Sequence, residues 1–256
     1  MELKVMTFNL RINVKQDGAN AWPNRVKEAA EVIKESGASI ICTQEGSYMM
    51  LKELEGLLPE YAWIGEGRQG GQEDEHCAIF YLRKRLEAVQ SGTFGLSEYP
   101  EQLGYMSWNT ACPRICTWAQ LRNSDGQHFY IFNTHLDHMS SEARTKGIRL
   151  VMERISRLCS ESGIQAVLAG DFNSNPESDV ISTLKESDLI NVYTALSGMM
   201  VGSTYHGFEG GEEGEPIDYI YVTGGVQIAS VHINRRKYNG RYPSDHYPVT
   251  AELSFT

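Results

Sequence analysis

Short apolar segments that end in a polar residue recur along the whole chain. Their length and their β-branched or aromatic content predict strands over residues 3–9, 38–43, 77–82, 115–121, 128–134, 166–169, 217–222, 226–233 and 248–255. Apolar residues at helical spacing predict helices after Pro23 and over residues 142–160, and a further helix is expected near residues 179–186, after Pro176. Many strands with few helices indicate two packed sheets covered by helices, rather than a repeating βαβ unit.

No linker, charge block or internal repeat divides the chain, so we expect a single domain over residues 1–256. The apolar fraction is 41% and the charged fraction 22%, which is ordinary for a globular protein. No apolar run approaches the roughly 18 residues that cross a bilayer. The N-terminus lacks the features of a signal peptide, which predicts a cytoplasmic protein, although removal of an export signal would leave the same sequence.

The five cysteines do not form a recognisable framework. Their odd number and apolar surroundings predict reduced, buried thiols rather than disulfides. Cys112 and Cys116 lack a second Cys/His pair at zinc-finger spacing, which disfavours a structural zinc site. No glycine-rich phosphate loop ending in Arg114 surrounds them, which disfavours a cysteine phosphatase.

The net charge of −10 argues against a partner with many phosphates. A protein that grips long duplex nucleic acid needs a basic face, because phosphate neutralisation dominates such binding. We therefore expect a short or small phosphorylated substrate. A local basic patch still exists at residues 235–237 with Arg241.

Polar residues with catalytic potential follow the predicted strands. Each of these side chains lies at or just beyond a strand end, or at a strand start: Asn9, Glu45, His135, Asp171, Asp218 and Asp245. Taken one at a time, Asp171 and Asn173 are also typical of a turn, and Glu45 is typical of a solvated strand end. A buried Asp218 needs a partner, and the imidazole of His246 is a natural one.

The complete set of motifs resembles one known family. The segments are Thr-Phe-Asn at 7–9, Gln-Glu at 44–45, Thr-His-Leu at 134–136, Gly-Asp-Phe-Asn at 170–173, Ile-Asp-Tyr-Ile at 217–220 and Ser-Asp-His-Tyr-Pro-Val at 244–249. They are similar to the signature of the endonuclease/exonuclease/phosphatase superfamily, and they extend from Met6 to Val249. The resemblance implies a deoxyribonuclease-I-like, four-layered α/β sandwich, in which helices flank two central, mostly antiparallel sheets.

Two further segments resemble a bacterial subgroup of the nocturnin-like deadenylase branch. They are Ala-Cys-Pro-Arg at 111–114 and Thr-Tyr-His-Gly-Phe at 204–208. These motifs are less diagnostic than the core set, and the substrate of such a subgroup need not be a nucleic acid.

The resemblance and the chemistry of phosphoester hydrolysis imply a metal site. Glu45 is expected to be the principal Mg²⁺ ligand, assisted by Asn9 and Asp245, with Mn²⁺ able to substitute. Mg²⁺ accepts few carboxylates and several waters, which suits this sparse set of ligands. The number of metal ions is not readable from the sequence.

The catalytic roles follow in the same way. Asp171 is expected to orient or deprotonate the attacking water, with Asn173 holding the water or a phosphate oxygen. Asp218 is expected to accept a hydrogen bond from His246, which then donates to the phosphoryl oxygens. His135 is expected near the leaving group or phosphate, as a hydrogen-bond donor or proton source.

Substrate contacts are predicted with open alternatives. Trp108 and Arg114 belong to the longest irregular stretch, where they would stack on a base and clasp a phosphate, or simply anchor the loop. Arg241 is expected to contact phosphate because it precedes Asp245 by four residues. His206 would either line the pocket or cap a turn.

Three functions compete at this point. The first is a Mg²⁺-dependent phosphodiesterase, with the 3′ end of single-stranded RNA as first candidate, acting as a 3′–5′ exoribonuclease. The second is a phosphatase or phosphodiesterase of sugar, inositol or lipid head-group phosphates. The third is an inactive binding or scaffold module, which is disfavoured because the water-activating residues are all present. The sequence predicts no oligomeric state.

Overall fold

A computed structural model describes residues 1–196, 198 and 200–255. Its centre consists of two six-stranded sheets. The first has the order β11-β12-β1-β2-β4-β3, with strands β1 (Glu2–Asn9), β2 (Ile40–Ser47), β3 (Tyr61–Ile64), β4 (Glu75–Leu82), β11 (Val226–Ile233) and β12 (Val249–Phe255). The second has the order β5-β6-β7-β8-β10-β9, with strands β5 (Leu86–Gly95), β6 (Ile115–Asn123), β7 (His128–His135), β8 (Ala166–Asp171), β9 (Ile190–Asn191) and β10 (Asp218–Val222).

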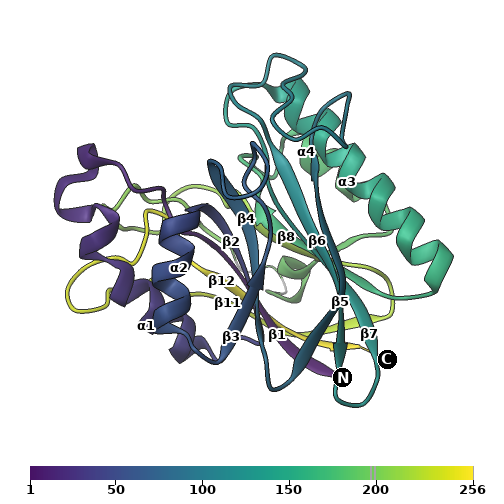
Figure 1. The fold of residues 1–256 in the computed structure, drawn as a ribbon, viewed down its shortest axis with the longest axis horizontal. Coiled ribbons are helices and arrows are strands. Elements are labelled where there is room, and N and C mark those ends of the chain that lie inside the picture. Colours follow the sequence, from purple (N-terminus) through teal and green to yellow (C-terminus); the bar gives the residue numbers. More distant parts are fainter. Residues whose placement is uncertain (197, 199, 256) are drawn as a thin grey trace.

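Helices cover the outer faces of both sheets, so that the molecule has four layers (Figure 1). The α-helices are α1 (Val26–Ser36), α2 (Tyr48–Leu57), α3 (Ser141–Ser162) and α4 (Asp179–Lys185), and the 3-10 helices are η1 (Lys15–Asn20), η2 (Trp22–Asn24) and η3 (Val192–Leu196). In Figure 1, α1 and α2 lie on one flank, and α3 and α4 lie on the other. The predicted four-layered, deoxyribonuclease-I-like sandwich is therefore confirmed.

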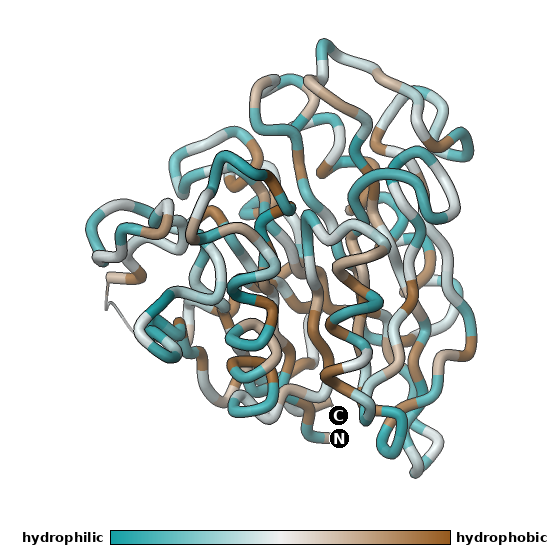
Figure 2. The backbone as a smooth tube through the Cα atoms, turned by 60° about the vertical axis from the view of Figure 1, so that its left-hand side comes forward, coloured by the Kyte–Doolittle hydropathy of each residue, from teal (hydrophilic) through white to brown (hydrophobic). Residues whose placement is uncertain are grey.

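Each sheet contains one parallel pair, β1–β2 in the first and β7–β8 in the second, and the other neighbours are antiparallel. The "mostly antiparallel" prediction holds in this sense. In Figure 2, hydrophobic segments gather on the interior strands, and hydrophilic ones lie on the loops at the periphery. The main apolar core lies between the sheets and extends beneath α3, through Ile148 and Val151. A second core joins α1 and α2 to the outer face of the first sheet.

Several element boundaries follow directly from local chemistry. Helix α3 begins where the side chain of Ser140 accepts a hydrogen bond from the backbone of Ala143, and it ends at Gly163 in the left-handed conformation. Pro23 lies in a 3-10 turn, and the α-helix proper begins at Val26. Helix α2 and strands β3 and β5 were not predicted from the sequence. No helix in the described part of the chain is long and apolar enough to cross a membrane.

Candidate functional site

The predicted polar residues converge because the two parallel pairs end at the same edge of the sandwich. Asn9 pairs in register with Gln44, next to Glu45, while His135 pairs with Asp171. Strand β10 runs antiparallel to β8 and therefore begins opposite its end, with Asp218 in register with Asp171. Strand order and direction alone thus gather residues that are far apart in the sequence.

A polar contact joins the two sheets directly beneath this edge. The side-chain amide of Gln44 donates to Oδ1 of Asn133 at 2.7 Å. The amide of Asn133 in turn donates to the carbonyls of Thr43 and Ala78 at 2.8 and 2.9 Å. Because these groups are fully buried, the bonds between them fix the relative position of the two sheets.

Asn9 connects the carboxylates of the two sheets. Its Nδ2 donates to Oε1 of Glu45 at 3.0 Å and to Oδ2 of Asp171 at 2.9 Å. The backbone N–H of Ile12 donates to the other oxygen of Glu45 at 2.9 Å. Burial would raise the pKa of Glu45, but these bonds outweigh it and hold the pKa below its ordinary value. Glu45 is therefore a carboxylate at neutral pH.

Glu45 also has a strained backbone. Its φ is 62°, in the left-handed region that non-glycine residues rarely adopt, and it lies where the β2–β4 register shifts. The shift redirects the Glu45 side chain from the sheet to the site. Asn173 is similar, with a φ of 46°. Such strain is concentrated at functional sites in many proteins.

His246 and Asp218 form a buried ion pair. Nδ1 of His246 lies 2.9 Å from Oδ2 of Asp218, and the two residues are 5% and 1% exposed. Burial opposes the imidazolium charge, but Asp218, Asp171 and Asp245 outweigh it and raise the pKa of His246 to about 10. His246 is therefore cationic at neutral pH.

Asp171 lies between this pair and Asn9. Its Oδ1 accepts the backbone N–H of Asn173 at 2.9 Å, while Nε2 of His246 lies 3.7 Å from its Oδ2. Burial and the neighbouring Asp218 carboxylate raise the pKa of Asp171 to about 7, against the lowering effect of His246 and Asn9. The carboxylate can accordingly gain or lose a proton near neutral pH.

His135 contacts the side chain of Asn173. Nδ2 of Asn173 lies 3.0 Å from Nε2 of His135 and donates to the Leu136 carbonyl at 3.0 Å. Burial, together with Arg114 and His246, lowers the pKa of His135 well below its ordinary value. His135 is thus neutral, and its Nε2 accepts a hydrogen bond from Asn173.

These groups open into a cavity of about 490 Å³. That volume is in the range of sites for small molecules. The cavity is lined by Arg11, Ile12, Glu45, Arg68, Glu75, Cys112, Arg114, His135, His138, Asp171, Asn173, Tyr205, Ile217, Asp245 and His246.

Two groups of residues at the site have the chemistry to hold a metal ion. Glu45 and Asp245 face the cavity from opposite segments, and burial together with Glu45 raises the pKa of Asp245. Two carboxylates that disfavour each other's charge fit a divalent cation, which would offset that repulsion. The donor atoms of Asp171, Asp218 and His246 also lie within 4.8 Å of one another. In this second group, however, the imidazolium of His246 already offsets the charge of the carboxylates, which disfavours a metal ion.

Three residues that were predicted to contact substrate do not line the cavity. The ring of Trp108 is covered by Lys146, whose Nζ lies 5.4 Å from its centroid. Arg241 donates to the carbonyl of Asn24 at 2.6 Å and belongs to the surface beside α1. His206 stacks on Tyr247, with ring centroids 4.0 Å apart. Burial lowers the pKa of His206 to about 4, so the ring is an uncharged packing group. The structure thus places these three residues outside the cavity lining, and their contact with substrate stays a prediction.

Several site residues were not predicted. Tyr205, next to His206, lines the cavity, and its ring centroid lies 5.0 Å from that of His246. Arg11 also lines the cavity, and its Nε lies 3.7 Å from Oδ2 of Asp245. A signal for Arg11 was available, because it follows Asn9 by two residues. Arg68 lies in the loop before β4 and Glu75 is the first residue of β4, and neither belongs to a recognisable motif.

Arg25 holds the loops that carry the site residues through hydrogen bonds to their backbone. It is fully buried and donates to four backbone carbonyls, those of Leu10, Arg11, Asn20 and Pro243. Two of these carbonyls follow Asn9, and another precedes Ser244 and Asp245. Arg25 therefore fixes two loops that carry site residues, a function that no sequence motif indicated.

Fold, strand-end residues and cavity define a phosphoesterase of the endonuclease/exonuclease/phosphatase class. The model of the Endonuclease/Exonuclease/phosphatase family matches residues 6–246, and the chain belongs to this family. The comparisons thus agree with the resemblance noted in the sequence.

Individual relatives cover the chain to different extents. A solved family member from Bacteroides vulgatus is 32% identical over the full length of both chains, with a TM-score of 0.93. A mannosyl-6-phosphatase from Bacteroides thetaiotaomicron is 30% identical, with 99% of this chain and all of that chain covered and a TM-score of 0.93. Nocturnin from Drosophila melanogaster is 22% identical over 92% of this chain and 42% of its own length. The chain thus spans about two fifths of the length of the curated relatives it matches.

Proposed function

We propose that the protein is a divalent-metal-dependent phosphatase that hydrolyses small phosphorylated molecules by attack of water on phosphorus. The observation that carries this proposal is the pairing of Asp171 with His246. A buried carboxylate with a pKa of about 7 lies beside a buried imidazolium at the wall of one cavity. Between these two pKa values, Asp171 is an unprotonated carboxylate and His246 is a protonated imidazolium. The first is suited to act as a base, and the second to stabilise negative charge on the phosphate.

Asp171 is the proposed base for the attacking water. A base works best when its pKa is near the working pH, because it is then both unprotonated and able to take a proton. The bonds from Asn9 and from the backbone of Asn173 hold the carboxylate in one orientation. The water would approach the oxygen of Asp171 that faces the cavity.

His246 is the proposed donor to the phosphoryl oxygens. Its Nδ1 proton is engaged by Asp218, whereas its Nε2 lies 3.7 Å from Asp171, beyond hydrogen-bond distance. The Nε2–H is therefore available to an oxygen that becomes more negative in the transition state. The fixed ion pair with Asp218 keeps the imidazole charged and oriented.

Asn173 and His135 are proposed to position the phosphate. The low pKa of His135 makes it a poor proton source at neutral pH. Its Nε2 instead fixes the amide of Asn173 beside Asp171. The sequence predicted His135 near the leaving group or phosphate, as a hydrogen-bond donor or proton source, and of these alternatives the low pKa disfavours the proton source.

Glu45 and Asp245 are the proposed metal ligands, with Asn9 between Glu45 and Asp171. A bound Mg²⁺ or Mn²⁺ would polarise the phosphoryl oxygens and offset negative charge on the phosphate. The side-chain amide of Asn9 and the backbone N–H of Ile12 keep Glu45 ionised, as a ligand requires.

Three features favour a small phosphate monoester over a nucleic acid. The cavity has the volume of a small-molecule site, and the net charge is −10. A mannosyl-6-phosphatase resembles this chain over almost its full length. We therefore place phosphorylated sugars first among the substrate candidates.

Cleavage of phosphodiesters remains the second candidate. Its support is the match to nocturnin over 92% of this chain, and it includes removal of nucleotides from the 3′ end of single-stranded RNA. That activity needs a track for the remaining polynucleotide, and such a track gains affinity from positive charge. The residues that line the described cavity include three arginines and four carboxylates, Arg11, Arg68 and Arg114 with Glu45, Glu75, Asp171 and Asp245.

A substrate panel separates these candidates. Purified protein with Mg²⁺ or Mn²⁺ is incubated with hexose 6-phosphates, inositol phosphates, bis-p-nitrophenyl phosphate and a 3′-labelled oligoadenylate. We expect release of inorganic phosphate from the monoesters and intact RNA. Shortening of the oligoadenylate without turnover of monoesters would establish the second candidate instead. No turnover of any ester with either metal would favour the inactive scaffold.

A further inference from the structure

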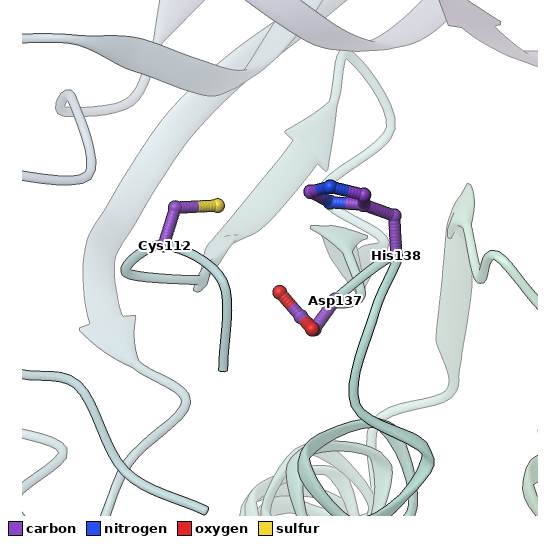
Figure 3. Close-up of side chains that lie close together, drawn as sticks. All are labelled: Cys112, Asp137 and His138. Carbon is purple, nitrogen blue, oxygen red and sulfur yellow. The ribbon is translucent and has the colours of Figure 1, made fainter. Parts of the chain in front are cut away.

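One end of the cavity contains a cluster that the proposed catalytic chemistry does not use. Cys112, Asp137 and His138 place one ligand-type atom each within 4.8 Å of one another. Figure 3 shows the thiol of Cys112 pointing toward the ring of His138, with the carboxylate of Asp137 beside both. A sulfur, an oxygen and a nitrogen at this spacing suggest a metal site at first sight.

The hydrogen bonds of the cluster contradict a metal site. Oδ1 of Asp137 accepts the backbone N–H groups of Met139 and Ser140 at 3.0 and 2.7 Å, and Oδ2 accepts that of Ala111 at 3.0 Å. The carboxylate is therefore occupied in holding the 107–113 loop against the start of α3. Burial also raises the pKa of the Cys112 thiol, which favours its uncharged form.

Two arginines surround the same cluster. NH1 of Arg68 lies 3.2 Å from the sulfur of Cys112, and Arg114 contacts both His138 and Asp137. Arg68 is already paired, with Asp74 at 2.8 Å and Glu75 at 3.0 Å. Positive charge beside the donor atoms disfavours a bound cation.

Arg114, which lies beside the cluster, has an unused donor. It is 7% exposed, and it lines the cavity. Its Nε lies 3.5 Å from Oδ2 of Asp137, and this nitrogen has no hydrogen-bond partner among the described residues. An arginine side chain has five N–H donors and does not lose its proton. A buried guanidinium with an unpaired donor gains free energy from an anion that completes its bonds.

The Arg114–His138 contact creates another donor. NH2 of Arg114 lies 2.8 Å from Nδ1 of His138. Because the guanidinium can only donate, Nδ1 must accept, and the neutral ring carries its proton on Nε2. His138 is exposed and lines the cavity, so this Nε2–H is available to a ligand.

We propose that Arg114 and His138 form a second anion subsite, and that the substrate carries a second negatively charged group, a phosphate or a carboxylate, besides the phosphate that is hydrolysed. This inference rests on the proposed phosphatase function, because it treats the Asp171–His246 end of the same cavity as the reaction centre. Arg114 contacts His138 and Asp137, which follow His135 toward α3. The two ends of the cavity therefore bind two different groups of one substrate.

Matched substrates test the subsite. The value of kcat/KM for phosphate release is measured for fructose 6-phosphate, fructose 1,6-bisphosphate and 6-phosphogluconate, so that the phosphate and the carboxylate are distinguished. We expect wild type to prefer at least one doubly anionic substrate. Arg114→Ala should reduce that preference by about 10-fold to 100-fold, as loss of bonds to a charged group implies. Arg114→Lys should retain part of it, and His138→Ala should reduce it less.

Arg122→Ala is the matched control, because Arg122 belongs to the far end of β6 and pairs with Glu87 on the surface. It should leave the preference unchanged. An equal loss for all three substrates in Arg114→Ala would show that Arg114 binds the hydrolysed phosphate, and would overturn the proposal. Absence of any preference in wild type would overturn it as well.

A binding measurement separates failure of the subsite from failure of the phosphatase function. Isothermal titration with Mg²⁺ present compares methylenebisphosphonate with methylphosphonate. Tighter binding of the bisphosphonate that is lost in Arg114→Ala supports the subsite even if no ester is hydrolysed. Titration with Zn²⁺ tests the alternative of a metal site. Binding of one Zn²⁺ ion by wild type that is lost in Cys112→Ser would establish a metal site and overturn the anion subsite.

Discussion

Asp218 accepts a hydrogen bond from Nδ1 of His246 at 2.9 Å and lies in register opposite Asp171 on the neighbouring strand. One carboxylate thus influences two protonation states. It raises the pKa of His246 to about 10, against burial, and after burial it is the largest cause that raises the pKa of Asp171 to about 7. Because the strand register places Asp218 beside both groups, Asp171 is unprotonated and His246 is protonated over the same pH range.

The pH dependence of the reaction follows from these pKa values. In wild type, kcat/KM should rise with pH as Asp171 loses its proton near pH 7. It should fall again as His246 loses its proton near pH 10. Asp218→Asn should move both limbs to lower pH, because it removes a charge that raises both pKa values. At neutral pH we expect a loss of about 10²- to 10⁴-fold in kcat/KM.

The exposed Asp125→Asn is the control for this profile, since Asp125 belongs to a surface turn away from the site. It should leave both limbs in place. A profile of Asp218→Asn that matches wild type would refute the roles assigned to the Asp218–His246 pair.

Arg25 should contribute strongly to the stability of the fold. Arg25→Lys cannot reach all four carbonyls that the guanidinium bonds, and the carbonyls of Leu10 and Pro243 would then be buried without partners. We expect the free energy of unfolding to fall by about 2–4 kcal/mol, measured by urea denaturation. Arg122→Lys, an exposed surface position, should change it by less than about 0.5 kcal/mol.

Gly170 should tolerate no side chain. A Cβ at this position would lie 2.0 Å from the carbonyl oxygen of Thr134 on the parallel neighbour. Gly170→Ala must therefore separate β7 from β8 beside Asp171, at a cost of about 1–3 kcal/mol in unfolding free energy. Gly56→Ala in α2 has open space and should stabilise the protein by about 0.5–1 kcal/mol. Equal effects of the two substitutions in thermal denaturation would contradict this explanation.

Divalent metal should stabilise the folded protein through Glu45. A ligand that binds only the native state at about 100 times its Kd adds about 2.7 kcal/mol to the free energy of unfolding. Differential scanning calorimetry should show a rise in Tm with Mg²⁺ or Mn²⁺ that Glu45→Gln abolishes and Asp245→Asn reduces. Glu213→Gln, on an exposed loop, should retain the full rise. A rise that persists in Glu45→Gln would place the metal elsewhere.

The sequence predicted the strand-end site residues because their position depends on strand direction. Asn9, His135 and Asp171 end strands of parallel pairs, so any two-sheet arrangement with this strand order brings them together. Helix α3 was also predicted, because its apolar spacing is regular, and α4 was predicted after Pro176. Strand β3 is short and half-buried, and its pattern alone does not distinguish it from a loop.

Loop residues were harder to place, because their direction depends on contacts with distant segments. Tyr205 forms an isolated bridge with His246, and adjacent residues of an extended segment point to opposite sides. Tyr205 therefore reaches the cavity, whereas His206 reaches Tyr247. No local pattern determines which of two such neighbours faces the site. Arg25 was missed for a related reason, since its partners are backbone carbonyls from three separate segments.

The most direct test of the proposed reaction is steady-state release of inorganic phosphate from hexose 6-phosphate by wild type and by Asp171→Asn, each with Mg²⁺ and with EDTA. Asp171→Asn preserves the shape of the side chain and removes the base. We predict Mg²⁺-dependent turnover by wild type, no turnover with EDTA, and a loss of about 10²-fold or more in the variant. Equal rates for wild type and Asp171→Asn, or turnover that persists in EDTA, would contradict metal-assisted hydrolysis at this site.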